Sequence, residues 1–224
     1  MIIFSEPNFA NWPDPENNHS FTGVMIDMKK IVLLAFFTAG FATHSFGQYV
    51  FDIKGKTMAY ARGFEKSAKS IVFELSSDYI SGQGIGQPEI FRRKEKSLPD
   101  LLVYYFPNTK DSTINYILYE WDDTNFAKNH DAVKQPVTAL QPYIDKYLSI
   151  QKQAEAVFGK AETSGTVNDV ALIETGRFKR KDNFSKDGVS VEMYVVLSNK
   201  QETNGIVSIM PTHRVRMYVR TSEQ

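Results

Sequence analysis

The stretch VSVEMYVVLS, residues 189–198, decides the fold class, because apolar and polar side chains alternate along it. Every second residue from Val189 to Leu197 is apolar. A period of two is typical of a β-strand that buries one face and leaves the other at the surface. Residues 214–221 repeat the pattern, with valine and methionine alternating with arginine and tyrosine. The end of the chain therefore predicts antiparallel strands that are half-buried.

Further strands are expected on the N-terminal side of this pair. Residues 101–106 and 113–121 are rich in β-branched and aromatic side chains, and the six residues between them contain Pro, Asn and Asp, which favour turns. This predicts a hairpin. Its second strand is largely apolar on both faces, which is typical of a central strand or of a strand with one face against a partner. Residues 206–210 predict a short strand, and residues 171–180 are a candidate for another.

Two segments show the helical period of apolar residues at steps of three or four. The first covers residues 54–80, although Ile71–Leu75 also suits a short strand. The second covers residues 131–158. Because Pro136 and Pro142 disfavour a helix interior, we expect two pieces, with the firm one from Pro142 to Phe158 and a stop at Gly159.

The order of these elements predicts an α+β fold, with an antiparallel sheet of about five strands packed with two main helices. Residues 81–96 are expected to be a loop, since they contain three glycines, Pro88 and a run of basic residues. No internal repeat or linker divides the chain after residue 48, so residues 48–224 are expected to form a single domain.

Residues 28–47 have the layout of a cleavable signal peptide. Lys29 and Lys30 precede an apolar stretch at residues 31–42, and small residues lead to a cleavage position between Gly47 and Gln48. The alternative is a membrane anchor, but a spanning helix needs about 20 apolar residues. Residues 1–27 fit no such layout and are expected to be a mis-assigned or disordered extension, with Met28 as the true start. The remaining protein is expected in the periplasm or outside the cell.

Composition narrows the classes of function. The chain has 26 basic and 26 acidic residues and no cysteine. The missing cysteine excludes thiol nucleophiles, disulfide chemistry and attachment of a lipid through cysteine. The balanced charge indicates no nucleic-acid partner and no strong attraction to anionic membranes.

Two motifs resemble ligand sites. The glycines at 82, 84 and 86 lack the spacing and the strand–helix context of a dinucleotide fingerprint. The polar run at residues 122–125, with His130 and Asp131, offers metal ligands, but it lacks the spacing of a calcium loop and equally suits a strand end followed by a helix cap. We therefore expect no cofactor and no metal.

A candidate ligand or partner face lies on the last strand. It comprises His213, Arg214, Arg216, Tyr218 and Arg220. The guanidinium group of arginine presents parallel N–H donors, which match the oxygens of carboxylates, phosphates and acidic sugars. The alternative is a solvated face whose arginines pair with neighbouring carboxylates. The aromatic residues between 104 and 121 are a second candidate platform, although such side chains more often belong to the core.

Two functions follow from these observations. The first is a non-catalytic binding or envelope-associated accessory domain, whose partner is an anionic envelope ligand or a protein. The second is a periplasmic or secreted hydrolase with His130 or His213 as its base. Since signatures such as G-x-S-x-G are missing, the sequence identifies no catalytic residue and favours the first.

Overall fold

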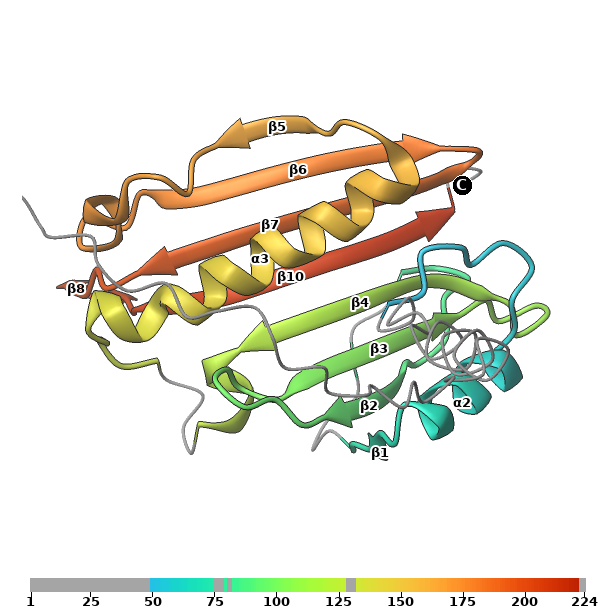
Figure 1. The fold of residues 1–224 in the computed structure, drawn as a ribbon. Coiled ribbons are helices and arrows are strands. Elements are labelled where there is room, and N and C mark those ends of the chain that lie inside the picture. Colours follow the sequence, from blue (N-terminus) through green and yellow to red (C-terminus); the bar gives the residue numbers. More distant parts are fainter. Residues whose placement is uncertain (1–48, 75–78, 80–81, 128–131, 222–224) are drawn as a thin grey trace, which may run out of the picture. The chain divides into compact units, whose positions relative to one another are not determined.

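A computed structural model describes residues 49–74, 79, 82–127 and 132–221 of the 224-residue chain (Figure 1). The signal-peptide segment at 28–47, the cleavage position at Gly47 and Gln48, and the extension at 1–27 lie outside the described residues. Within the described ranges the chain is α+β, with a large antiparallel sheet and two α-helices. This class agrees with the sequence-based prediction.

Eight of the described strands form one antiparallel sheet in the order β1-β2-β3-β4-β10-β7-β6-β5. The strands are β1 (Ile71–Val72), β2 (Glu89–Arg93), β3 (Leu101–Pro107), β4 (Ile114–Asp122), β5 (Glu162–Gly165), β6 (Phe178–Lys186), β7 (Val189–Ser198) and β10 (Thr212–Thr221). The expected number of about five strands is therefore too low. Strands β1, β2 and β5 contain two, five and four residues, which is too short to show a clear apolar period.

Several elements lie where the sequence predicts them. Strands β3 and β4 form the expected hairpin. Strand β4 lies between β3 and β10. Both of its faces are largely apolar because they belong to two hydrophobic clusters, with Tyr119 and Trp121 in the main core and Leu118 in a second cluster. Strand β7 spans Val189–Ser198 as expected, and β10 begins at Thr212, two residues before the predicted start.

Two expectations for strands and loops are wrong, and a third is confirmed as a strand but not as part of the main sheet. The predicted loop at 81–96 contains β2. Residues 171–180 contain most of the 3₁₀ helix η2 (Val170–Ile173) and only the start of β6. The strand expected at 206–210 is β9 (Val207–Ile209), which pairs with β8 (Glu202–Asn204) in a separate two-stranded ladder. In each case the local residue pattern is too short to specify the pairing partner.

The helices also differ from expectation at their ends. Helix α2 (Met58–Ser67) is shorter than the predicted segment, and Ile71–Val72 form strand β1, the alternative that the sequence left open. Helix α3 (Val137–Phe158) is continuous through Pro142, so the predicted division into two pieces is wrong. A proline in the second turn of a helix removes one backbone hydrogen bond, and the packing of α3 on the sheet outweighs that loss. The helix ends at Gly159, which has a positive φ of 86°.

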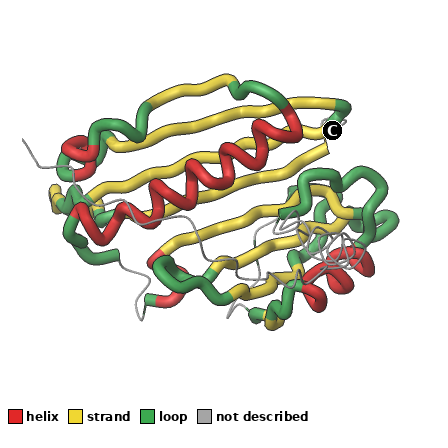
Figure 2. The backbone as a smooth tube through the Cα atoms, viewed as in Figure 1, coloured by secondary structure: helices red, strands yellow, loops and turns green. Residues whose placement is uncertain are grey.

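Both helices cover the same face of the sheet, which we call the helix face (Figure 2). Helix α3 lies across β6, β7 and β10, and the hydroxyl of Tyr147 donates a hydrogen bond to the buried Asp182 at 2.7 Å. Helix α2 is attached through the buried Glu65, which accepts a hydrogen bond from the hydroxyl of Tyr105 at 2.7 Å. The main hydrophobic core lies between this face and the helices. None of the helices in the described part of the chain is long and apolar enough to cross a membrane.

Candidate functional site

The opposite side of β4, β10, β7 and β6 forms what we call the open face, because α3 does not cover it. Every second residue of each strand points there, since side chains alternate along a strand. The strand register arranges these side chains in four rows across the sheet. The first row is Tyr116, Arg220, Ser190 and Ser185; the second is Leu118, Tyr218, Glu192 and Asn183; the third is Glu120, Arg216, Tyr194 and Lys181; the fourth is Asp122, Arg214, Val196 and Lys179.

Two of the three arginines on this face form ion pairs within their own row. Arg214 contacts Asp122, and Arg216 contacts Glu120. Both carboxylates are almost completely buried, with 2% and 4% of their side chains exposed. Burial lowers the pKa of Arg216, but Glu120 together with Tyr194 and Tyr218 outweighs burial and raises that pKa. The charges of these two arginines neutralise buried carboxylates, so we assign both arginines a structural role.

Aromatic side chains form a strip across the open face. The rings of Phe106 and Tyr116 stack with centroids 4.1 Å apart, and Tyr218 lies 6.5 Å from both Tyr116 and Tyr194. Partial burial raises the pKa of Tyr116 and of Tyr218 to about 12. Their hydroxyls therefore stay protonated at neutral pH and can donate hydrogen bonds.

Arg220 differs from the other two arginines of the face. Its guanidinium lies over the ring of Tyr218, 4.3 Å from the centroid, and 5.8 Å from that of Tyr116. Its row neighbours, Tyr116 and Ser190, carry no charge. Among the described residues, Arg220 forms no ion pair with a carboxylate. The arginine is therefore held by aromatic rings while its N–H edge stays available.

His213 does not belong to the open face. It alternates with Arg214, so its ring points to the helix face, where it is completely buried. Its Nδ1 lies 2.7 Å from Oδ2 of Asp123, and its Nε2 lies 3.1 Å from Oδ1 of Asn199. The structure thus brings together Arg214, Arg216, Tyr218 and Arg220 of the predicted site and separates His213 from them.

The polar run at residues 122–125 has a structural role. Asp122 caps the 3₁₀ helix η1 (Asp123–Phe126) by accepting a hydrogen bond from the backbone N–H of Thr124 at 3.0 Å. No group of three or more metal-ligating side chains gathers among the residues that the structure describes. His130 and Asp131, the other candidates of this run, lie outside the described residues.

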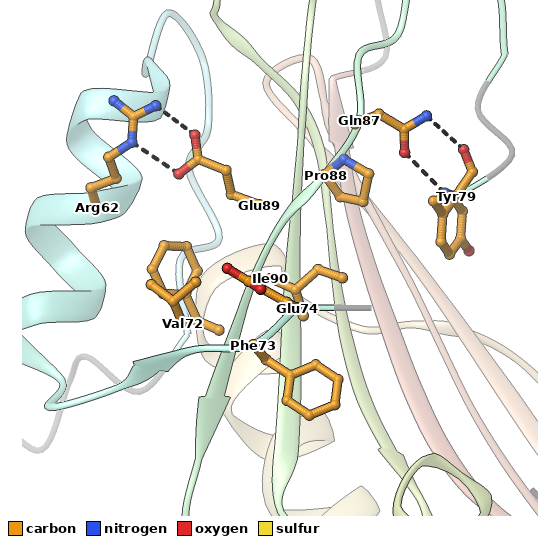
Figure 3. A pocket seen from close by; sticks show the side chains of 10 residues that line it. Arg62, Val72, Phe73, Glu74, Tyr79, Gln87, Pro88, Glu89 and Ile90 are labelled. Carbon is orange, nitrogen blue, oxygen red and sulfur yellow. Dashed lines mark hydrogen bonds and ion pairs between the residues drawn. The ribbon is translucent and has the colours of Figure 1, made fainter. Parts of the chain in front are cut away.

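A pocket of about 610 Å³ lies between α2 and the edge formed by β1 and β2 (Figure 3). Val72, Phe73 and Ile90 supply apolar walls. Arg62 and Glu89 form an ion pair across it, with Nε 2.9 Å from Oε2. The charge of Arg62 is therefore balanced by that of Glu89. The sequence does not predict this pocket, because the residues that line it come from separate segments of the chain.

Sequence reasoning missed Ser185, Ser190 and the neighbours that distinguish Arg220. One signal could have found the two serines. Asp187 and Gly188 connect β6 to β7, and both have a positive φ, as a two-residue type I′ hairpin requires. Asp-Gly between two strands predicts the register, which places Ser185 opposite Ser190.

Comparisons of this chain with protein-family models, curated proteins and solved structures found no match.

Proposed function

We propose that this chain is an exported, non-catalytic binding domain that holds an anionic group of its ligand on the open face, with Arg220 as the anchor. One observation carries this proposal. Of the three arginines on the face, Arg220 is stacked on aromatic rings and has no carboxylate partner among the described residues. Arg214 and Arg216 are already paired.

The geometry around Arg220 suits anion binding. Ring stacking restricts the long side chain, so less rotamer entropy is lost when a ligand binds. The guanidinium presents parallel N–H donors, which match two oxygens of a carboxylate or phosphate. The hydroxyls of Tyr116 and Ser190 lie next to it in the same row. This refines the sequence-based hypothesis from a whole basic strand to one arginine.

The hydrolase hypothesis gains no support from His213. A general base must come within hydrogen-bond reach of its substrate. The ring of His213 is completely buried, and both of its nitrogens already contact protein side chains. His130, the other candidate base, lies outside the described residues. A binding function is therefore the better-supported interpretation.

The proposal is tested by NMR on the full chain, observing the Nε–H signals of the arginines while sodium acetate is added against sodium chloride at equal ionic strength. We expect the Arg220 signal to shift and saturate with acetate, because its N–H edge is available. The signals of Arg214 and Arg216 should stay in place, because their donors are occupied. Arg220→Gln identifies the signal and removes the effect. If all three signals move in parallel, or if none moves, Arg220 is not an anion site.

A further inference from the structure

We infer that the ligand of the open face is an acidic saccharide, whose carboxylate contacts Arg220 and whose hydroxyls follow the first row of the sheet. This inference rests on the proposed function and adds the chemical class of the ligand. The first row contains one guanidinium and three hydroxyl-bearing residues: Tyr116, Arg220, Ser190 and Ser185.

The hydroxyls of this row are available to a ligand. The side-chain oxygens of Tyr116, Ser185 and Ser190 have no hydrogen-bond partner among the described residues, and none of the three residues is buried. Adjacent strands lie about 4.8 Å apart, so the row from β4 to β6 extends roughly 14 Å. A ligand that follows the row meets a hydrogen-bonding group on every strand. Saccharides carry hydroxyl groups all along their length, so they match this spacing of polar groups.

An apolar or flat aromatic ligand fits the surface less well. The ring of Tyr116 is stacked on Phe106, and Arg220 covers a face of Tyr218. Because these ring faces contact each other or the guanidinium, the strip offers mainly edges and hydroxyls to a ligand. The exposed chemistry of the first row is therefore polar.

A polyanion with closely spaced phosphates also fits less well. Such polymers are recognised by several cations that each contact a phosphate. Here Arg214 and Arg216 are neutralised by buried carboxylates, and Lys181 pairs with Glu192 at 2.5 Å. Among the described residues the face therefore offers two cations without a carboxylate partner, Arg220 in the first row and Lys179 in the fourth. They lie three rows apart, and the row neighbours of Arg220 are neutral polar groups. That arrangement suits a ligand with one carboxylate among many hydroxyls.

The test is affinity electrophoresis of the full chain in native gels that contain polygalacturonate, neutral dextran or polyphosphate. We expect polygalacturonate to retard the chain and dextran to have no effect. Arg220→Gln should weaken the interaction roughly tenfold or more, since hydrogen bonds to charged groups are the stronger class. Arg220→Lys keeps the charge but loses the parallel N–H donors of the guanidinium group. Polygalacturonate should therefore retard this variant less than the unmodified chain and more than Arg220→Gln. Lys152→Gln makes the same charge change on the exposed side of α3 and should leave retardation unchanged.

A second variant separates this inference from the proposed function. Ser185→Ala combined with Ser190→Ala removes two row hydroxyls without changing charge. We expect weaker retardation by polygalacturonate and an unchanged acetate shift at Arg220. No retardation by polygalacturonate, or equal retardation by polyphosphate, overturns the saccharide assignment while a saturable acetate shift still supports the anion site. If acetate does not shift the Arg220 signal in the unmodified chain, both the anion site and the saccharide assignment are overturned.

Discussion

At the residue scale, the neighbours of a side chain decide what an arginine can do. Arg214, Arg216 and Arg220 look equivalent in the sequence, because they alternate on one strand. The register gives the first two a carboxylate on β4 and gives Arg220 a tyrosine instead. The sequence shows the charge of each arginine but not its ion-pair partner, because the partners of Arg214 and Arg216 are 92 and 96 residues away along the chain.

Gly165 provides a residue-scale prediction. It ends the edge strand β5 with a positive φ of 81°, and a Cβ atom there would lie 2.1 Å from the carbonyl oxygen of Lys179. Gly165→Ala should lower the free energy of unfolding by more than about 1 kcal/mol, because the native backbone is incompatible with a side chain. Urea unfolding measures the change.

Gly63 is the matched control. It lies inside α2, and a Cβ atom at this position would have no other heavy atom within 4 Å beyond its own helix backbone and chain neighbours. Gly63→Ala should raise the free energy of unfolding by roughly 0.5–1 kcal/mol, because alanine loses less backbone entropy in a helix. Equal effects of the two substitutions would contradict the contact seen at Gly165.

At the element scale, helix α2 is attached to β2 by two ion pairs that differ in burial. Glu65 of α2 pairs with Arg93 of β2, and both side chains are at most 9% exposed. Arg62 of α2 pairs with Glu89 of β2, and those side chains are 60% and 36% exposed. The two pairs join the same elements, so they allow a direct comparison of buried and exposed charge.

The buried pair should dominate the attachment of α2. Glu65→Ala leaves Arg93 without its carboxylate in the interior and should lower the free energy of unfolding by roughly 3–5 kcal/mol. Glu89→Ala breaks the exposed pair and should cause a much smaller loss, because water solvates the remaining arginine. Chemical denaturation of both variants checks this. A loss at Glu89 as large as that at Glu65 would show that burial does not govern this attachment.

Element prediction succeeded where a segment was long and periodic. Strands β7 and β4 and helix α3 were located from their apolar patterns. It failed at β2 and β5 and left β1 as an alternative to a helix, because the pairing of these short strands depends on the neighbouring strand rather than on their own few residues. It also misplaced β6, of which the candidate strand at 171–180 covers only the start. The single helix through Pro142 shows the same effect, since tertiary packing outweighs a local preference.

At the scale of the whole molecule, the sheet separates two roles. Its helix face holds the main core, and its open face carries the charged and hydroxyl-bearing rows. The two faces alternate residue by residue along β7 and β10. This division follows from the two-residue period of a strand. It explains why His213 and Arg214 have unrelated surroundings although they are adjacent in the chain.

Export is a prediction about the whole chain. We expect the protein to be recovered outside the cytoplasm with Gln48 as its first residue, because residues 28–47 have the charged, apolar and small-residue layout of a signal peptide. N-terminal sequencing of material from the periplasm or the medium checks this. Recovery of intact chain in the cytosol, or of peptides from residues 1–27 in the exported material, would contradict it.

The sequence by itself determined the fold class, the strands β4, β7 and β10 and most of helix α3, because hydrophobic periodicity reports which side of an element is buried. It also identified a strand with alternating arginines as a candidate ligand face. Only the tertiary structure decided that Arg220 alone of the three lacks a carboxylate partner among the described residues and that His213 lies in the interior. The physical reason is strand register. The residue opposite on the next strand determines whether a charged side chain forms an ion pair, and a local sequence pattern does not specify which distant residue lies opposite.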